Sequence, residues 1–220
     1  MTKGRPAGVD AVGSERSATA SGDVQSTRER VLDVARKMFA ENGYERTTVA
    51  AIARQLDIKA PALYWHFASK EEILFSIIED YLARFVDAAS VDKDRSPDDR
   101  LREMVRNHVL FQLSWRSDVE RYEIMIRAAQ LGRALTADHR KQITALQRTV
   151  LEEYRAILRS GVQAGCFLLD DVTVTAFALI TMCEQVVSWY RPEGRLEPAE
   201  IAAHYVSLAE RMVGMRPATS

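Results

Sequence analysis

The sequence predicts an all-α protein of about nine helices, and three observations support this fold class. Apolar residues recur at spacings of three and four through most of the 220 residues, which is the period of an amphipathic helix. Helix start signals precede these stretches, and Gly or Asn follows several of them. No segment shows the strict alternation of a half-buried strand that would argue for a sheet.

Residues 26–29 (Ser-Thr-Arg-Glu) have the pattern of a capping box and predict the start of the first helix. This helix is expected to end at Asn42 and Gly43, which both tolerate the left-handed cap conformation. The preceding residues 1–24 are rich in Ser, Ala, Gly and Thr, so they bury too little apolar surface to become ordered. We expect a flexible arm, which either has no role or touches DNA.

Residues 47–67 have the pattern of a helix-turn-helix. Thr48 is expected to cap a short second helix, and Pro61 lies in the first turn of a third, where its missing N–H costs nothing. The apolar residues that would fix the crossing of the two helices are Ile52, Leu56, Ile58, Leu63 and Phe67. Because the second helix of such a motif enters the major groove, we predict that this segment binds DNA.

The outer face of this third helix suits contact with DNA. Small side chains at its N-terminal end allow close approach to the bases, and larger polar-tipped groups reach phosphates or base edges. The residues expected on this face are Lys59, Ala60, Ala62, Tyr64, Trp65 and His66. Residues 28–71 hold eight Lys or Arg against six Asp or Glu, a net charge of +2, so basicity alone does not establish DNA binding.

Residues 69–72 form another capping box and begin a fourth helix. A polar break at 90–99 is either the link between two domains or a loop within one body. Further helices are expected over about residues 97–115, 117–131, 137–165, 171–190 and 198–212. The expected organisation is a flexible arm at 1–24, a DNA-binding domain at 25–70, and an effector-binding and dimerisation domain at 71–216.

Composition and charge exclude several classes of protein. The net charge of −1 argues against a chain that coats polyanions over its whole surface. No apolar run approaches the roughly 18 residues needed to cross a bilayer, and no secretory signal is recognisable. Cys166 and Cys183 stand in apolar surroundings without CxxC spacing. We expect a cytoplasmic protein with core thiols and without a disulfide, metal site or cofactor.

The DNA-binding segment resembles the tetracycline-repressor-like (TetR) family of bacterial regulators. The resemblance rests on residues 47–49, 63–67 and 69–71 together with Ala35, Phe39, Gly43, Tyr44, Ile52, Ala53 and Leu74. It covers about residues 27–74, and this motif is highly specific. The family implies a three-helix DNA-binding domain, a larger helical ligand-binding domain, and a homodimer. It also implies that a small molecule in the second domain changes the spacing of the two reading helices.

The same resemblance implies which residues contact DNA, and it shows two departures from the family pattern. Asp57 stands where Gly is usual in the turn, and Asp adopts the left-handed conformation at some cost. Lys59 stands where Ser or Thr usually caps the recognition helix, which loses a cap worth about 1 kcal/mol but offers an extra DNA contact. The implied contacts are Thr47, Thr48, Lys59, Ala60, Pro61, Tyr64, Trp65, His66 and Lys70.

The second domain is expected to hold the effector. Bulky apolar residues crowd the predicted helices between residues 97 and 131, and a helical bundle of this kind can hold an apolar ligand. Each such residue is more often a plain core residue, and polar groups such as Gln112 lie near the same faces. The residues singled out for the ligand are Asn107, His108, Phe111, Trp115, Tyr122, Met125 and Arg127.

The last two predicted helices carry wide apolar faces. Two such helices from each of two chains would make a four-helix interface about a two-fold axis, as the family does, whereas the alternative is that these faces pack only internally. The residues assigned to the dimer interface are Leu179, Cys183, Val186, Val187, Tyr190, Tyr205, Leu208 and Met212.

Residues 161–167 and 187–196 resemble the C-terminal domains of regulators of fatty-acid and steroid catabolism, which respond to acyl-CoA thioesters. The resemblance implies a small apolar effector such as an acyl-CoA or a fatty acid. The phosphates of an acyl-CoA need cations, for which the candidates are Arg121, Arg127, Arg133 and Arg148.

Three hypotheses of function follow. The first is a repressor that binds a palindromic operator as a dimer and is released by a small apolar effector, with repression implied by the family. The second is a DNA-binding protein without an effector, whose second domain only dimerises. The third is a helical enzyme, which is not expected because the sequence shows no carboxylate pair, nucleophile–base pair or metal cluster.

Overall fold

Helices account for all the regular secondary structure in the computed structural model, which describes residues 16–114 and 134–215. The all-α prediction is therefore confirmed for the described part of the chain, and the helix predicted over 117–131 lies outside it. The elements are α1 Arg16–Asn42, α2 Val49–Gln55, α3 Ala60–Tyr64, α4 Lys70–Ala88, α5 Pro97–Ser114, α7 Ala137–Gln163, α8 Val172–Glu184, the short 3-10 helix η1 Gln185–Ser188, and α9 Pro198–Met212.

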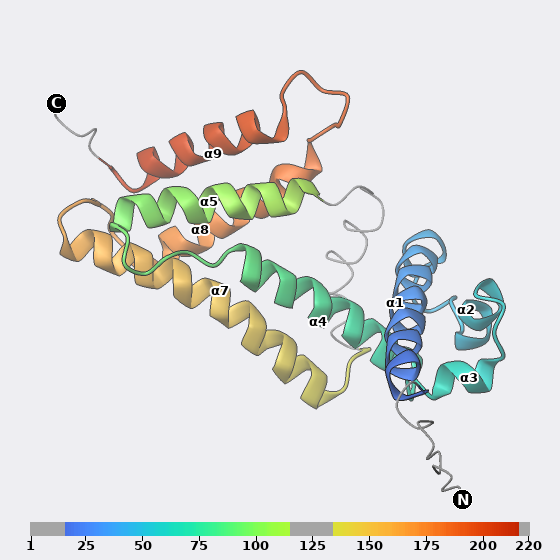
Figure 1. Cartoon of the computed structure of the whole chain (residues 1–220). Coiled ribbons are helices and arrows are strands. Elements are labelled where there is room, and N and C mark those ends of the chain that lie inside the picture. Colours follow the sequence, from blue (N-terminus) through green and yellow to red (C-terminus); the bar gives the residue numbers. More distant parts are fainter. Residues whose placement is uncertain (1–15, 115–133, 216–220) are drawn as a thin grey trace, which may run out of the picture.

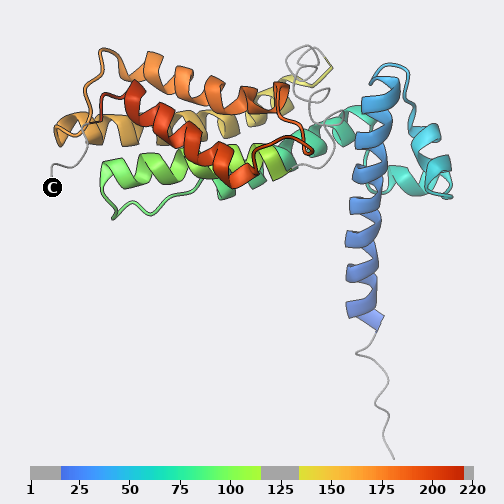
Figure 2. The same ribbon diagram turned by 90° about the horizontal axis from the view of Figure 1, so that it is seen from above.

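The helices form a small head and an elongated body (Figure 1). Helices α1, α2 and α3 gather at one end of the molecule, and α5, α7, α8 and α9 lie side by side in the body. Helix α1 stands across the long axis of the body (Figure 2). Helix α4 runs from the head into the body, so one continuous helix joins the two parts.

Each part has its own hydrophobic core, and α4 belongs to both. In the head core, Ile73 and Ile77 of α4 pack with residues of α1, α2 and α3. At the other end of α4, Phe85 packs in the body core with residues of α5, α7 and α8. The start of α7 also reaches the head core through Ile143. The head is therefore packed onto the body by two helices.

The turn of the helix-turn-helix is closed by backbone hydrogen bonds at the end of α2. The N–H of Ile58 donates to the carbonyl of Ala53 (3.0 Å), and the N–H of Asp57 donates to that of Arg54 (3.1 Å). This pair of bonds defines a Schellman motif, whose penultimate residue adopts the left-handed conformation. Asp57 does so, with φ of 55°, which confirms the conformation predicted from the sequence.

Several predicted helix boundaries are confirmed, and one is wrong. The side chains of Thr48, Ser69, Thr136 and Asp171 each accept a hydrogen bond from a backbone N–H in the first turn of the following helix. Helix α1, however, begins at Arg16 rather than after a capping box at residues 26–29. The local signal is overridden because extending an existing helix costs far less than nucleating one.

The polar segment predicted as a break is a loop within the body. It connects the end of α4 to the start of α5, after α4 has already crossed from the head. Of the two alternatives raised by the sequence, the interhelical loop is the one observed. No helix in the described ranges is long and apolar enough to cross a membrane.

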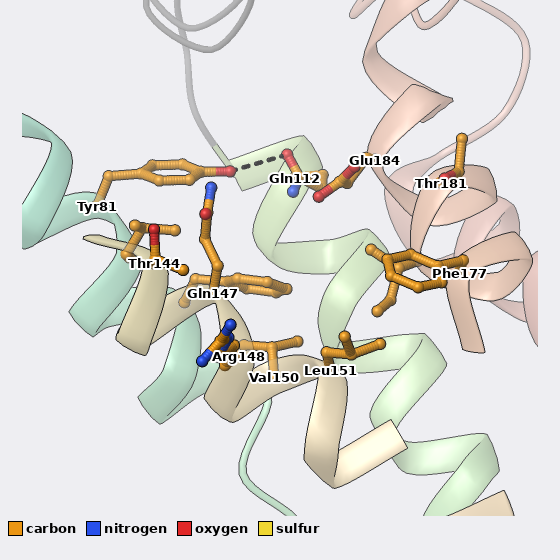
Figure 3. A pocket seen from close by; sticks show the side chains of 13 residues that line it. Tyr81, Gln112, Thr144, Gln147, Arg148, Val150, Leu151, Phe177, Thr181 and Glu184 are labelled. Atoms are coloured by element: carbon orange, nitrogen blue, oxygen red, sulfur yellow. Dashed lines mark hydrogen bonds between the residues drawn. The ribbon is translucent and has the colours of Figure 1, made fainter. Parts of the chain in front are cut away.

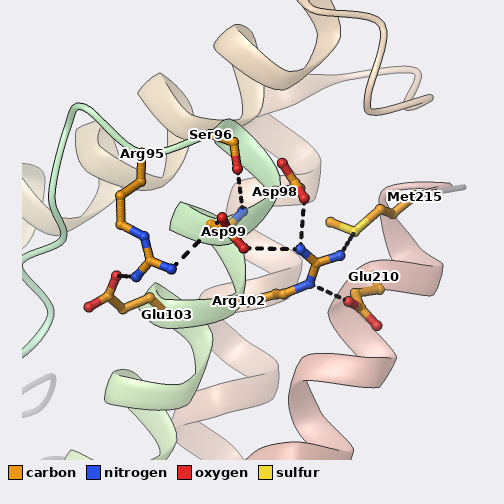
Figure 4. A network of polar contacts seen from close by, with 8 residues as sticks. All are labelled: Arg95, Ser96, Asp98, Asp99, Arg102, Glu103, Glu210 and Met215. Carbon is orange, nitrogen blue, oxygen red and sulfur yellow. Dashed lines mark hydrogen bonds and ion pairs between the residues drawn. The ribbon is translucent and has the colours of Figure 1, made fainter. Parts of the chain in front are cut away.

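At the end of the body that lies away from the head, where α5 begins and α9 ends (Figure 1), Arg102 forms a network of polar contacts (Figure 4). Its Nε atom lies 2.7 Å from Oε1 of Glu210 on α9, and its Nη1 lies 2.7 Å from Oδ2 of Asp98. Its Nη2 also donates to Sδ of Met215 (3.1 Å). These contacts raise the pKa of Arg102, mainly through Glu210. The first turn of α5 is thereby held to the last turn of α9.

Replacing Asp57 tests the strain in the helix-turn-helix. Asp57→Gly is expected to raise the free energy of unfolding by about 0.5 kcal/mol, since Gly lacks the Cβ that disfavours a positive φ. Asp57→Ala, the matched contrast, is expected to lower it by about 1 kcal/mol. Urea unfolding of the full chain measures both values. Equal effects of Gly and Ala would contradict the role of the left-handed conformation.

Candidate DNA interface and effector cavity

The last residue of α3 and the two residues that follow it carry exposed or partly exposed side chains. Leu63 and Phe67 are buried in the head core, so the helix cannot turn about its axis. Between them, Tyr64 is 53% exposed and Trp65 is 88% exposed, and His66 is partly exposed. An aromatic ring that a folded chain leaves in water gains nothing from packing, so this row favours a binding surface.

The N-terminal end of α3 is exposed to solvent. Lys59, Pro61 and Ala62 are exposed, and Ala60 is partly exposed. Lys59 occupies the cap position, and its side chain makes no capping hydrogen bond to any described residue. The predicted loss of a cap is therefore confirmed, and the exposed side chain of Lys59 lies at the N-terminal end of α3.

The two threonines before α2 have different roles. Thr48 is exposed and caps α2 by accepting from the N–H of Ala51 (3.1 Å). Thr47 is buried, and its hydroxyl donates toward the carbonyls of Gly43 (2.9 Å) and Met38 (3.2 Å) at the end of α1. Thr48 thus lies at the surface where DNA would dock, whereas Thr47 holds the turn between α1 and α2.

Lys70 links the start of α4 to the same turn. Its Nζ donates to the carbonyl of Tyr44 (2.9 Å) and lies 4.1 Å from the centre of the Tyr44 ring. The Tyr44 ring in turn packs edge-on against Phe39. The ammonium group of Lys70 therefore already has partners within the head. Its contact with a DNA phosphate stays a prediction.

The body contains a cavity of about 360 Å³ between α4, α5, α7 and α8 (Figure 3). Its walls are mainly apolar, with a few polar groups, which is the composition usual for small-molecule sites. The residues that line it are Tyr81, Leu82, Phe85, Gln112, Thr144, Gln147, Arg148, Val150, Leu151, Phe177, Ile180, Thr181 and Glu184. Helix α4 supplies three of these residues, so the helix that follows the DNA-binding motif also forms a wall of the cavity.

A more open groove continues from this cavity along the outer face of α7. Thr144 and Arg148 line both spaces, so the two are contiguous. The groove also contains the cations Arg140 and Lys141, together with the carboxylate of Glu152. An apolar cavity that opens onto a mainly cationic groove can hold an apolar group and an attached anionic group at the same time.

Of the ligand residues predicted from the sequence, the three that the structure describes do not line the cavity. Asn107, His108 and Phe111 are on α5, and none of them is among the residues that line it. Phe111 packs between Tyr81 and Phe85, with ring centres 5.4 and 5.2 Å away. The remaining four predictions fall in the undescribed part of the chain: Trp115, Tyr122, Met125 and Arg127, as do the candidate cations Arg121 and Arg133.

His108 is a core residue. It is fully buried, its Nδ1 lies 3.0 Å from the hydroxyl of Tyr154, and its Nε2 has no hydrogen-bond partner among the described residues. Burial lowers the pKa of His108 to about 3, so the ring is neutral at physiological pH. Its neutral state means that it cannot neutralise an anionic ligand.

A polar contact joins α4 and α7 next to the head. Oε1 of Glu71, in the first turn of α4, accepts from the N–H of Thr136 (2.9 Å) and lies 2.7 Å from Nδ1 of His139 in the first turn of α7. The His139 ring stacks on Phe75 of α4, with ring centres 3.8 Å apart and an interplanar angle of 7°. Helices α4 and α7, which both line the cavity, are therefore held together where they meet the head.

Both parts of the chain match known protein families. Residues 31–77 match the family described as bacterial regulatory proteins, tetR family, and residues 94–213 match the tetracyclin repressor-like C-terminal domain. The second match alone covers more than half of the chain. The chain belongs to the TetR family. It is therefore a transcriptional regulator with a helix-turn-helix DNA-binding domain, as the sequence predicted.

Individual TetR-family relatives are similar to this chain over most of their length. The chain is 30% identical over 200 residues to the HTH-type transcriptional repressor KstR2 of Mycobacterium tuberculosis, covering 86% of this chain and 93% of that one. A bacterial regulatory protein of the tetR family from Rhodococcus RHA1 superposes with a TM-score of 0.75 at 28% identity, covering 86% and 98%. The structure of KstR2 of Mycobacterium tuberculosis gives a TM-score of 0.68 at 26% identity, covering 87% and 95%.

The residues of this TetR-family chain that were predicted for dimerisation divide into two groups. Leu179, Cys183 and Val186 are fully buried in the body core, so they have no exposed surface of their own to offer a partner. Burial raises the pKa of the Cys183 thiol to about 12, which keeps it protonated. Val187, Tyr190 and Tyr205 are largely covered, and Leu208 and Met212 of α9 are exposed.

Sequence reasoning missed other exposed apolar residues on the same helices. Val174 and Phe177 of α8 are 67% and 52% exposed, although an apolar helix gives no internal signal of which face is buried. Sequence reasoning also missed Tyr81 and Glu184 as cavity residues. Each is a polar side chain within an otherwise apolar helix, and this pattern could have singled them out. Among the described residues, no cluster of three or more His, Cys, Asp or Glu side chains is arranged to hold a metal.

Replacing Lys59 tests the DNA interface of this regulator. Lys59→Ser is expected to stabilise the fold by about 1 kcal/mol, because Ser can cap α3 by accepting from the N–H of Ala62. The same change is expected to reduce the slope of log K against log salt by about 0.9, since one phosphate contact is lost. Fluorescence anisotropy with operator DNA between about 50 and 200 mM salt measures the slope. Lys93→Ser, in the loop between α4 and α5, is the control, and an unchanged slope for Lys59→Ser means that Lys59 does not touch phosphate.

Proposed function

We propose that this TetR-family regulator is a homodimeric repressor that binds a palindromic operator and is released by a small apolar effector, an acyl-CoA thioester. It is a binding protein and not an enzyme. One observation carries the proposal: the cavity in the body shares helix α4 with the DNA-binding head. A ligand that displaces α4 at the cavity must also act on the helix that positions α3.

Dimerisation is supported by the apolar side chains exposed on the last two α-helices. Val174 of α8 and Leu208 and Met212 of α9 are exposed and do not line the cavity. Such side chains lower the free energy when a second copy covers them, and two helices from each chain form a four-helix interface. A two-fold dimer would place two copies of α3 about 34–36 Å apart, or a multiple of that, along an operator with the same symmetry.

The effector class is supported by the cavity and its groove. The cavity volume of about 360 Å³ falls in the range of small-molecule sites, which is about 300–1,000 Å³. An acyl chain would occupy the apolar cavity, and the phosphates of the CoA moiety would lie along the groove beside Arg140, Lys141 and Arg148. Repression as the mode of control is supported by the KstR2 relatives, which are named transcriptional repressors.

A regulator without an effector is the main alternative. In that case the body serves only to dimerise, and a solid core is expected there. The cavity beside α4 favours the effector-responsive hypothesis, and the release experiment below separates the two.

Operator release by acyl-CoA tests the proposed function. Footprinting of DNA upstream of the gene is expected to show a protected two-fold sequence, and octanoyl-CoA is expected to release the protein from it, whereas CoA alone is not. Arg148→Ala is expected to raise the concentration for half-release about three- to fivefold, since an exposed cation contributes modestly. Arg106→Ala, at an exposed arginine of α5 that lines neither the cavity nor the groove, is the control.

Each part of the proposal can fail separately in this experiment. A footprint without two-fold symmetry contradicts the dimeric operator. Release by neither acyl-CoA thioesters nor fatty acids contradicts the effector class and favours the regulator without an effector. If the effector releases wild type and Arg148→Ala at the same concentration, the groove does not bind the CoA phosphates.

A further inference from the structure

Two polar side chains of the cavity have hydrogen-bonding capacity that the described part of the protein does not use. Gln112 of α5 is 1% exposed, and its Oε1 accepts from the hydroxyl of Tyr81 at 3.3 Å. Its amide nitrogen has no hydrogen-bond partner among the described residues. Glu184 of α8 lines the same cavity and makes no hydrogen bond or ion pair within residues 16–114 and 134–215.

These groups lie together on one side of the cavity (Figure 3). Tyr81, Gln112 and Glu184 reach it from three different helices, and Arg148 of α7 lies on the opposite side. Glu184 is partly buried, and this burial raises the pKa of its carboxyl group. The cavity therefore has a polar side formed by Tyr81, Gln112 and Glu184, and Gln147 lies between this side and Arg148.

The amide of Gln112 is buried and the carboxyl group of Glu184 is partly buried, and both cost free energy if a ligand removes their water without replacing its hydrogen bonds. A purely hydrocarbon ligand would displace water from the cavity and leave both groups unpaired. A ligand with an oxygen function at the right place would instead satisfy them. A hydroxyl group can accept from the Gln112 amide and donate to the Glu184 carboxylate, whereas a keto oxygen can only accept.

We propose that the cavity selects an effector whose apolar part carries a hydroxyl group, bound between the amide of Gln112 and the carboxyl group of Glu184. Tyr81 positions the amide by donating to its oxygen. This inference rests on the proposed function, because it concerns the same cavity. It narrows the effector class from acyl-CoA thioesters in general to hydroxyacyl thioesters, with the hydroxyl group distant from the thioester.

The test compares thioesters that differ only by one hydroxyl group. Binding to the full-length protein is measured by calorimetry, and operator release by anisotropy, for C6, C8 and C10 acyl-CoA and their ω-hydroxyl counterparts. The best hydroxylated member is expected to bind about 10- to 100-fold more tightly than its plain counterpart. In Gln112→Leu, which keeps the volume of the side chain, this preference is expected to fall to within about twofold.

Two further variants separate recognition from folding. Tyr81→Phe removes only the hydroxyl that positions Gln112, and Glu184→Gln keeps the shape of the acceptor. Each is expected to reduce the preference while leaving the thermal midpoint and operator affinity near wild type. Gln142→Leu, the same change at an exposed position of α7 outside the cavity, is the control and is expected to keep the full preference.

The outcomes distinguish this inference from the proposed function. If plain and hydroxylated thioesters bind and release equally, or if Gln112→Leu weakens both to the same degree, the inference is overturned and the effector class stands. If no member of either series binds, both are overturned.

Discussion

The structure depends on the burial of one helix in two cores. Helix α4 packs in the head core with α1, α2 and α3 through its first half, and its last turns lie in the body, where Phe85 packs against His108 and Phe111 of α5. Close-packed interiors do not deform continuously, so a displacement of α4 at one end must be accommodated at the other. The position of α3 relative to the body is set in this way, and any ligand in the cavity acts on the same helix.

The contact of Glu71 with Thr136 and His139 strengthens this dependence. It fastens the first turn of α4 to the first turn of α7, and α7 supplies five residues to the cavity wall. The two helices α4 and α7, which both line the cavity, are thus joined by one polar contact beside the head. At the opposite end of the body, the ion pair of Arg102 with Glu210 holds α5 to α9.

The head could be predicted from the sequence because its signals are local. The Schellman turn at Asp57, the uncapped Lys59 and the caps at Thr48 and Ser69 all depend on residues a few positions apart. The effector cavity could not be predicted in the same way, since Tyr81, Gln112 and Glu184 come from three helices and meet only through tertiary packing. The same limit explains why Leu179 and Cys183 were assigned to the dimer interface, although packing buries them inside the chain. The start of α1 at Arg16 was missed because a weak helical segment continues from a stable one.

Thermodynamic coupling between effector and operator tests the central role of α4 and its contact with α7 most directly. The measurement is the ratio of operator affinities without and with saturating effector, in wild type, Glu71→Ala and Glu79→Ala, the last being a matched change on the same helix. The account predicts that Glu71→Ala keeps operator affinity and effector affinity near wild type but lowers the coupling ratio about three- to tenfold, while Glu79→Ala leaves it unchanged. An unchanged ratio in Glu71→Ala would contradict the account.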